Sequence, residues 1–146
     1  MITIHEYRAE ELIDNKEFDA LVREYATYNR LPNTDAVANF DLRAYLDFDC
    51  APIAVLKDDK KMVGLMCIIL ENHMHTNELL FAVDSYFIKP EYRKNGNAEK
   101  LMSWAKETTR KHGVKNLICS AYHGTALEKV FFRKYKPLET WFTVEI

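Results

Sequence analysis

The chain has 146 residues, of which 48% are hydrophobic and 29% are charged, and its formal net charge is −2 at pH 7. This length predicts a single domain, residues 1–146, whose hydrophobic core is large enough to need no disulfide and no structural metal. The near-neutral charge argues against a nucleic-acid-binding domain and against recruitment to a membrane by overall charge.

The first part of the chain predicts an edge strand followed by two helices. Residues 2–7 alternate between apolar and polar side chains, which is the pattern of a half-buried strand. Residues 18–26 carry apolar side chains at helical spacing, and the run RLPN at 30–33 stops that helix. A second helix is predicted to begin at Asn33-Thr34-Asp35 and to end before Cys50-Ala51-Pro52.

The period of the apolar residues then changes from helical to strand-like. Residues 53–57 and 62–70 predict a hairpin joined by a charged turn, and its second strand is apolar on both faces. A strand that is apolar on both faces lies in the middle of a sheet, so we expect 62–70 to be central. A polar loop follows, and residues 79–88 then predict another long strand, closed by Lys89-Pro90.

The last part of the chain alternates helices and strands. A helix is predicted from near Gly96 to His112-Gly113, where glycine ends it. A strand over 117–121, a helix over 126–134 and a final alternating strand over 138–146 follow. The full order is a strand, two helices, three strands that can pair antiparallel, and then helix, strand, helix and strand.

Cysteine and histidine usage argues against disulfides and metal. Cys50, Cys67 and Cys119 are odd in number, lie far apart and have apolar neighbours, as buried thiols in a reducing compartment do. No cysteine pair has the spacing of a zinc site, and His73 and His75 fit an exposed loop pair better than a metal site. No apolar run is long enough to span a bilayer. We therefore expect a cytoplasmic protein with no metal and no membrane partner.

The segment RKNGNA, residues 93–98, leads directly into the helix that begins near Gly96. The first N–H groups of a helix have no partner within the helix, and together with the helix dipole they favour an anion. Gly96 permits a positive φ and has no Cβ to keep a phosphate away, while Arg93 and Lys94 supply cationic donors. These features fit a phosphate site, but they also fit a capped helix whose basic residues are solvated.

The longer segment YFIKPEYRKNGNAEKLMSWAKE resembles the core motif of the GNAT superfamily of acyl-CoA-dependent N-acyltransferases. The family pattern Arg/Gln-x-x-Gly-x-Gly/Ala is matched by Arg93, Gly96 and Ala98, and the preceding residues IKPEYR match those that usually come before it. The order of elements is also the family's order. More loosely, the end of the chain is similar to GNAT-like proteins encoded by bacteriophages.

The resemblance implies an α/β (α+β) fold of the GNAT type. Its sheet would be mixed, mostly antiparallel, with about six or seven strands, splayed between the fourth and the fifth and flanked by about four helices. In this family the strand before the motif carries a β-bulge, here near Tyr86 or Phe87. The backbone of that strand pairs with the pantetheine arm and the thioester carbonyl of acetyl-CoA.

The resemblance also implies which residues contact acetyl-CoA, the co-substrate. By position, the strand contacts fall on Phe87 and Ile88. The pyrophosphate would be held by the loop that comprises Arg93, Lys94, Asn95, Gly96, Asn97 and Ala98. No metal is implied.

The implied reaction is direct attack on the thioester by a primary amine of a small molecule, a peptide or a modified base. It needs a neutral amine, a donor for the oxyanion and a proton source for the thiolate. Family members often carry a carboxylate at the position of Asp84. Alternation predicts that Asp84, Tyr86 and Ile88 share one face, from which Asp84 could accept the proton of the amine. Alternatively, Asp84 holds a neighbouring Lys or Arg, or binds a cationic substrate.

The helix over 126–134 departs from the family pattern, which often places a tyrosine there. The corresponding residue is Val130 or, with a shift of register, Phe131 or Phe132, and none has a hydroxyl. The leaving thiolate would then be protonated by water or by a substitute. The candidates are Tyr122, His123 and Tyr135, although His123 also fits a plain loop histidine.

The missing hydroxyl keeps a second function open, namely a GNAT-fold CoA-binding or structural protein without acetyltransferase activity. The expected partners are an amine-bearing acceptor and a second copy of the chain, as a homodimer.

Overall fold

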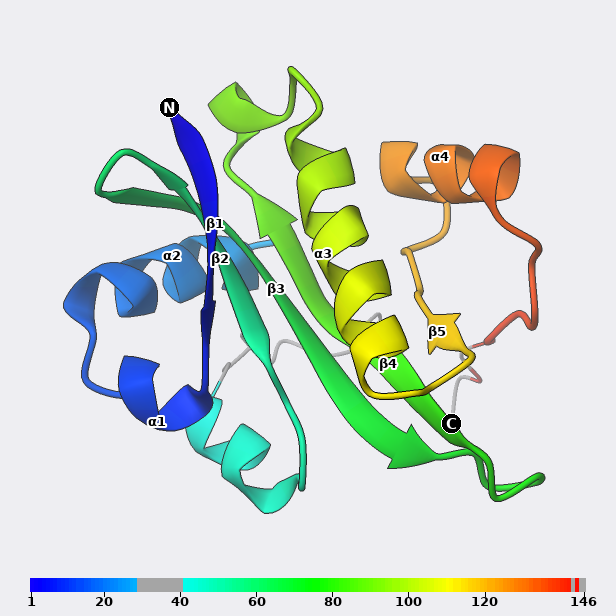
Figure 1. Cartoon of the computed structure of the whole chain (residues 1–146). Coiled ribbons are helices and arrows are strands. Elements are labelled where there is room, and N and C mark those ends of the chain that lie inside the picture. Colours follow the sequence, from blue (N-terminus) through cyan, green and yellow to red (C-terminus); the bar gives the residue numbers. More distant parts are fainter. Residues whose placement is uncertain (29–40, 143, 145–146) are drawn as a thin grey trace.

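The computed structural model describes residues 1–28, 41–142 and 144, and Figure 1 shows their arrangement. A central sheet lies between two layers of helices, with α1 (Ala9–Leu12) and α2 (Lys16–Ala26) on one face. On the other face, α3 (Asn97–Lys111) crosses the sheet, and α4 (Ala126–Lys134) lies beyond it. These four α-helices match the predicted number. Two short 3-10 helices complete the description, η1 (Leu42–Asp47) and η2 (Pro90–Tyr92).

The sheet has five strands, and their order in space is their order in the sequence. The strands are β1 (Ile2–Tyr7), β2 (Ile53–Asp58), β3 (Lys61–Asn72), β4 (Leu79–Ile88) and β5 (Leu117–Ile118). Each of the first four pairs antiparallel with its neighbour, whereas β5 pairs parallel with β4. The predicted mixed, mostly antiparallel sheet is thus confirmed. The central position predicted for β3 is also confirmed, since its middle residues are buried on both faces.

Each face of the sheet has its own apolar core. On the α2 side, Phe18 and Leu21 pack against Leu65 of β3, and all three are essentially inaccessible to solvent. On the α3 side, Leu101 and Ala105 pack against Met66. Full burial of such side chains contributes about 1.5–3 kcal/mol each. The alternation of β3 therefore holds both helix layers on one strand.

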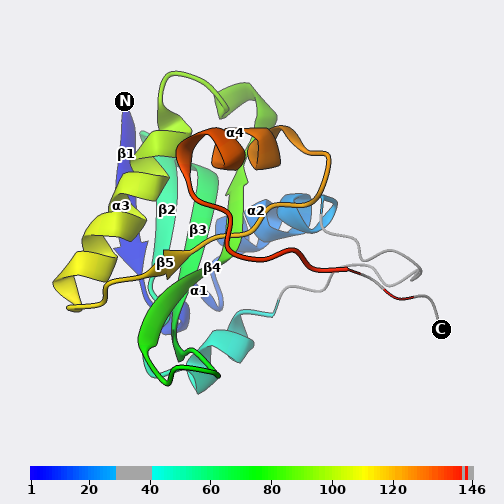
Figure 2. The same ribbon diagram turned by 90° about the vertical axis from the view of Figure 1, so that its right-hand side faces the viewer.

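The splay predicted between the fourth and fifth strands is present. Residues of β5 pair with β4 only at Phe81 and Ala82. Beyond Ala82 no described strand pairs with this side of β4, although the strand continues to Ile88. Figure 2 shows β5 leaving β4 at this point and the chain turning up towards α4. Within the described part of the chain, this half of β4 therefore has one open edge.

Three predicted elements differ from the structure. The predicted strand over 117–121 has two residues, Leu117 and Ile118, because β4 is no longer beside it further on. The second predicted helix is replaced in its described part by η1, and the remainder, residues 33–40, lies outside the described residues.

The predicted final strand is not observed either, so the described sheet has five strands where six or seven were predicted. Residues 138–142 and 144 belong to no helix or strand, and residues 143, 145 and 146 lie outside the described part. Trp141 and Phe142 are 86% and 84% exposed. An alternating pattern makes a strand only where a neighbouring strand supplies hydrogen bonds and covers one face. Among the described residues, none does so here.

No helix within the described ranges combines the length and the apolar character needed to cross a membrane.

Candidate active site at the open edge of β4

A β-bulge interrupts the pairing of β4 with β3. Cys67 pairs with Ser85, but the next residue of β3, Ile68, pairs with Val83, so Asp84 is the extra residue. The bulge was predicted near Tyr86 or Phe87, and the structure places it at Asp84 instead. Register is set by the strand opposite, which a reading of β4 by itself does not include.

The bulge changes which side chains share a face. Val83 and Tyr86 pack into the core under α3. Asp84 and Ser85, which lie between them, both point to the opposite face, where they contact Tyr45 of η1. The prediction that Asp84 shares a face with Tyr86 and Ile88 is therefore wrong, because an extra residue in a strand shifts the alternation by one.

The Asp84 carboxylate is held by two hydroxyl groups. The Tyr45 hydroxyl donates to Asp84 Oδ2, and Ser85 Oγ donates to the same oxygen over 3.0 Å. The two hydroxyl oxygens lie 3.0 Å apart. Tyr45 is 6% exposed, and burial, more than any other cause, raises the pKa of its phenol well above the usual value. The hydroxyl therefore stays protonated and keeps its donor proton near neutral pH.

Asp84 itself is open to solvent. Among the residues that the structure describes, no Lys or Arg forms an ion pair with it, so the alternative reading as a structural ion-pair partner has no support there. Among the described residues, ion pairing therefore does not occupy Asp84, and the exposed carboxylate can accept a proton from, or bind, a cationic group.

The loop before α3 has an unusual backbone. Asn95 and Gly96 both have positive φ, 57° and 74°, and Gly96 is the N-cap of α3. Within the described chain, the N–H groups of Lys94, Asn95, Gly96 and Ala98 donate to no protein acceptor. A Cβ added to Gly96 would meet no atom within 4 Å, so the space in front of these groups is open. Neighbouring N–H groups in this conformation form an anion-binding concavity at the positive end of a long helix.

The buried side chain of Asn97 holds this loop to the preceding segment. Its side chain is 4% exposed, and its Nδ2 donates to the carbonyl of Tyr92 over 2.9 Å. Its buried Oδ1 has no hydrogen-bond partner among the described residues. The side chain of Asn97 is thus turned into the protein, and its backbone N–H donates to the carbonyl of Lys94.

Arg93 is directed to the helix layer rather than to the loop opening. Its Nε donates to the carbonyl of Ile88 over 2.7 Å. Its guanidinium group lies 5.2 Å from the ring centre of Tyr28 and 5.5 Å from that of Phe87, as in cation–π contacts. This side chain therefore ties the loop to the end of β4 and to Tyr28, which follows α2. Lys94 is also exposed, and no described residue forms an ion pair with it.

Phe87 and Ile88, the two strand residues predicted to contact acetyl-CoA, direct their backbone groups to opposite sides of β4. The Phe87 carbonyl oxygen would lie 3.0 Å from a Cβ at Gly64 of β3, so it faces the neighbouring strand. Lys89 N–H donates to Val63 of the same strand. Backbone groups alternate in direction along a strand. The N–H and C=O groups of Ile88, which lies between Phe87 and Lys89, therefore point to the open edge. Its carbonyl there accepts from Arg93.

The segment between β5 and α4 holds two of the predicted proton donors, Tyr122 and His123, whereas Tyr135 follows the end of α4. His123 is almost fully exposed, and its Nδ1 lies 3.1 Å from Glu128 Oε1. The other oxygen of Glu128 accepts from Gly124 N–H, and Thr125 caps the helix. His123 thus pairs with a capping residue of α4. Tyr122 is half exposed, and Tyr135 packs against Phe131 and Lys106.

Tyr45 and Ser85 were missed by the reading of the sequence. Ser85 had no distinguishing signal in an apolar strand. Tyr45 is 39 residues before Asp84 and belongs to no motif in the sequence. Because the two meet through the bulge, no spacing in the sequence could have joined them.

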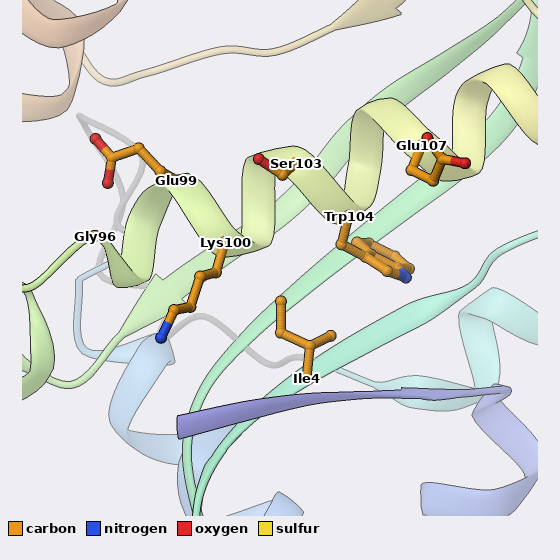
Figure 3. A pocket seen from close by; sticks show the side chains of 7 residues that line it. All are labelled: Ile4, Gly96, Glu99, Lys100, Ser103, Trp104 and Glu107. Atoms are coloured by element: carbon orange, nitrogen blue, oxygen red, sulfur yellow. The ribbon is translucent and has the colours of Figure 1, made fainter. Parts of the chain in front are cut away.

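A shallow depression extends from Gly96 along α3 towards β1, on the side away from the open edge of β4 (Figure 3). Its floor is formed by Ile4 and Trp104, and the indole N–H of Trp104 is already bound to Glu6. Charged side chains of α3 lie around it. Within the described ranges, no group of three or more His, Cys, Asp or Glu residues could hold a metal ion.

Comparison with known proteins gives a consistent result. The model of the Acetyltransferase (GNAT) family matches residues 15–131. The chain is similar in fold to the ribosomal-protein-alanine N-acetyltransferase from Brucella melitensis biovar Abortus 2308, with 17% identity and a TM-score of 0.72, covering 99% of this chain and 97% of that chain. No curated protein matches the sequence.

Two further solved structures carry ligands. An aminoglycoside acetyltransferase from an uncultured soil metagenomic sample, in complex with sisomicin, has 15% identity and a TM-score of 0.70, covering 99% of this chain and 97% of that chain. The aminoglycoside N-acetyltransferase AAC(6')-Iy, in complex with CoA, has 12% identity and a TM-score of 0.76, covering 100% of this chain and 95% of that chain. At these identities the likeness concerns the fold.

Proposed function

Because this chain belongs to the GNAT acetyltransferase family, we propose that it transfers an acetyl group from acetyl-CoA to a primary amine. The observation that carries the proposal is the loop before α3. Four N–H groups of this loop have no acceptor among the described residues, and a Cβ at Gly96 would meet no atom within 4 Å, which suits the pyrophosphate of CoA. The loop would hold the pyrophosphate through the backbone of Lys94 to Ala98, with the Lys94 side chain as an added cation. Arg93 would support the loop and not touch the phosphate.

The open edge of β4 suits the rest of the cofactor. A pantetheine arm is linear and rich in amides, so it can pair with strand groups that have no neighbour. We assign this pairing to the outward backbone groups of Tyr86 and Ile88. The Ile88 carbonyl would remain on Arg93 or exchange that bond for one to the cofactor.

Asp84 is the proposed proton acceptor. An acceptor that arrives as R–NH3⁺ gives one proton to the Asp84 carboxylate, directly or through water. The nitrogen lone pair then forms the N–C bond to the thioester carbonyl carbon. The C–S bond breaks with its electron pair left on sulfur, the nitrogen loses its second proton and the thiolate gains one. The net products are the acetylated amine, CoA thiol and one proton.

Three candidates can supply the proton that the thiolate takes up: Tyr122, His123 and water. Tyr122 and His123 lie between β5 and α4, shortly before Thr125, the N-cap of α4. His123 would have to leave Glu128 to reach the thiolate. We favour water or Tyr122 for this reason.

A second candidate function is CoA binding without acetyl transfer. It is favoured by α4, whose nine residues, ALEKVFFRK, include no hydroxyl group. Under this proposal the loop before α3 keeps its role, and Asp84 binds a cation without chemistry.

The deciding experiment incubates the protein with acetyl-CoA and a panel of primary amines that includes aminoglycosides, polyamines and peptides with a free α-amino group. Release of CoA thiol is followed with a thiol reagent, and acetylated amine by mass spectrometry. Amine-dependent release supports the acetyltransferase. Calorimetric binding of acetyl-CoA without transfer to any amine supports the binding protein, and absence of binding overturns both.

A further inference from the structure

We infer that Tyr45 is a positioning residue for Asp84: it holds one carboxylate oxygen so that the other is presented to the acceptor amine. This inference rests on the proposed role of Asp84 as proton acceptor. It assigns a function to a residue of η1 that lies outside the family motif and was not part of the predicted site.

Two hydroxyl groups hold the same oxygen of the Asp84 carboxylate. Tyr45 OH and Ser85 Oγ both donate to Oδ2 of Asp84, while within the described residues no protein group donates to Oδ1. A bulge residue projects from an irregular part of the strand, where the sheet alone does not fix its side chain. Two donors on a single oxygen fix both the rotation of the carboxylate and the direction of the free oxygen.

Tyr45 is itself well anchored. It is buried in the core between η1, α2 and β3, together with Phe18 and Leu65. The groups that act on the pKa of its phenol include the Cys67 thiol of β3 and the Asp84 carboxyl of β4. Burial raises the pKa of the Cys67 thiol, so this thiol stays neutral. The phenol also stays neutral near neutral pH, because burial raises its pKa.

Burial explains why a tyrosine suits this position. A phenol carries its hydroxyl at the end of a rigid apolar ring, so it can reach from a dry core to a polar group at the edge. Ser85, which belongs to β4, supplies the second hydroxyl donor. The pair therefore links the packing of η1 directly to the orientation of the carboxylate.

The test compares Tyr45→Phe with Tyr7→Phe. Both remove a hydroxyl from a tyrosine that contacts the same core, and Tyr7 OH accepts from Lys57 Nζ, away from Asp84. We expect Tyr45→Phe to lower kcat about tenfold with an unchanged Kd for acetyl-CoA. The free energy of a hydrogen bond to a charged group corresponds to a change in rate of about this size. The acidic limb of its pH–rate profile should move to higher pH, because a carboxylate that loses a donor takes up a proton more easily. Tyr7→Phe should leave both measurements unchanged.

A second readout does not depend on activity. The carboxyl carbon of Asp84, followed by NMR during a pH titration, should titrate at higher pH in Tyr45→Phe than in the wild type, and Ser85→Ala should shift it in the same direction. An unchanged titration in both variants overturns the inference even if acetyl transfer is found. If no amine is acetylated by the wild type, the proposed function fails, and a shifted titration still supports the link between Tyr45 and Asp84.

Discussion

Asp84 and Ser85 follow one another in β4 and yet point to the same face of the sheet, where both contact the hydroxyl of Tyr45. Consecutive residues of a regular strand point to opposite faces, so this arrangement exists only because of the bulge opposite Cys67 and Ile68. It brings a solvent-open carboxylate to the α2 side of the strand, while the open edge of the same strand remains free for a cofactor.

Asp84→Asn tests the proposed proton acceptor. The amide keeps the size of the carboxylate but cannot take a proton from an ammonium ion, so we expect kcat to fall about 100-fold or more. Binding of acetyl-CoA, measured by calorimetry, should be unchanged. Asp19→Asn on α2, where Asp19 pairs with Arg23 on the surface, is the control. Wild-type turnover in Asp84→Asn would remove this residue from the mechanism.

Gly96→Ala tests the phosphate loop, and Gly113→Ala provides a closely matched control. The two glycines flank α3 and have similar φ angles of 74° and 68°, and a Cβ at either would meet no protein atom within 4 Å. Each substitution should cost about 1 kcal/mol or more of stability, because L side chains are strained at positive φ. Only at Gly96 would the new Cβ stand in the space proposed for the pyrophosphate.

We therefore expect the Kd for acetyl-CoA to rise about tenfold or more in Gly96→Ala, a loss of about 1.4 kcal/mol, and to change little in Gly113→Ala. Calorimetric titration of both variants measures this directly. Equal affinities in the two variants would contradict the assignment of the loop as the pyrophosphate site.

Gly64→Ala tests how closely β3 and β4 approach. An added Cβ would lie 3.0 Å from the Phe87 carbonyl oxygen and 3.3 Å from side-chain atoms of Ile88 and Leu56. Because both strands are held in the sheet, the clash cannot be relieved by a side chain alone. We expect the free energy of unfolding to fall by about 1–3 kcal/mol, as measured by urea denaturation. An unchanged midpoint would show that β4 can shift away from β3.

Stability should fall at alkaline pH, and Tyr45 should account for part of the loss. Burial raises the pKa of Tyr45 and of Tyr86 above the ordinary value of 10.0. As the pH rises through about 10, the unfolded chain loses these two phenol protons, while the folded protein keeps them. The free energy of unfolding therefore falls as the pH rises through this range. The stabilising effect is complete below the unfolded pKa.

Urea denaturation at a series of pH values checks this. Tyr45→Phe has no phenol to ionise in the unfolded state, so its free energy of unfolding should fall less steeply than that of the wild type above about pH 10. Tyr86→Phe should behave in the same way. Identical slopes in the wild type and in both variants would be the contrary result.

The sequence by itself determined much of the fold. The apolar character of β3 on both faces predicted a central strand, and the structure confirms it because only the middle of a sheet buries both faces. The bounds of β4 and α4 were predicted as they are observed. The glycine in RKNGNA also predicted a helix start with positive φ, since glycine is the residue that adopts it without strain. Such features depend on neighbours in the sequence.

Tertiary structure decided the parts that depend on partners distant in the sequence. The sequence could not place the bulge at Asp84, because the extra residue is defined by its count against β3. Nor could it predict that Arg93 turns to Tyr28 and Phe87. The same holds for the end of the chain, where alternation predicted a strand but the described residues 138–142 and 144 have none beside them. Local pattern fixes what a segment can become, whereas pairing and burial against distant segments fix its register, its ends and the direction of its functional side chains.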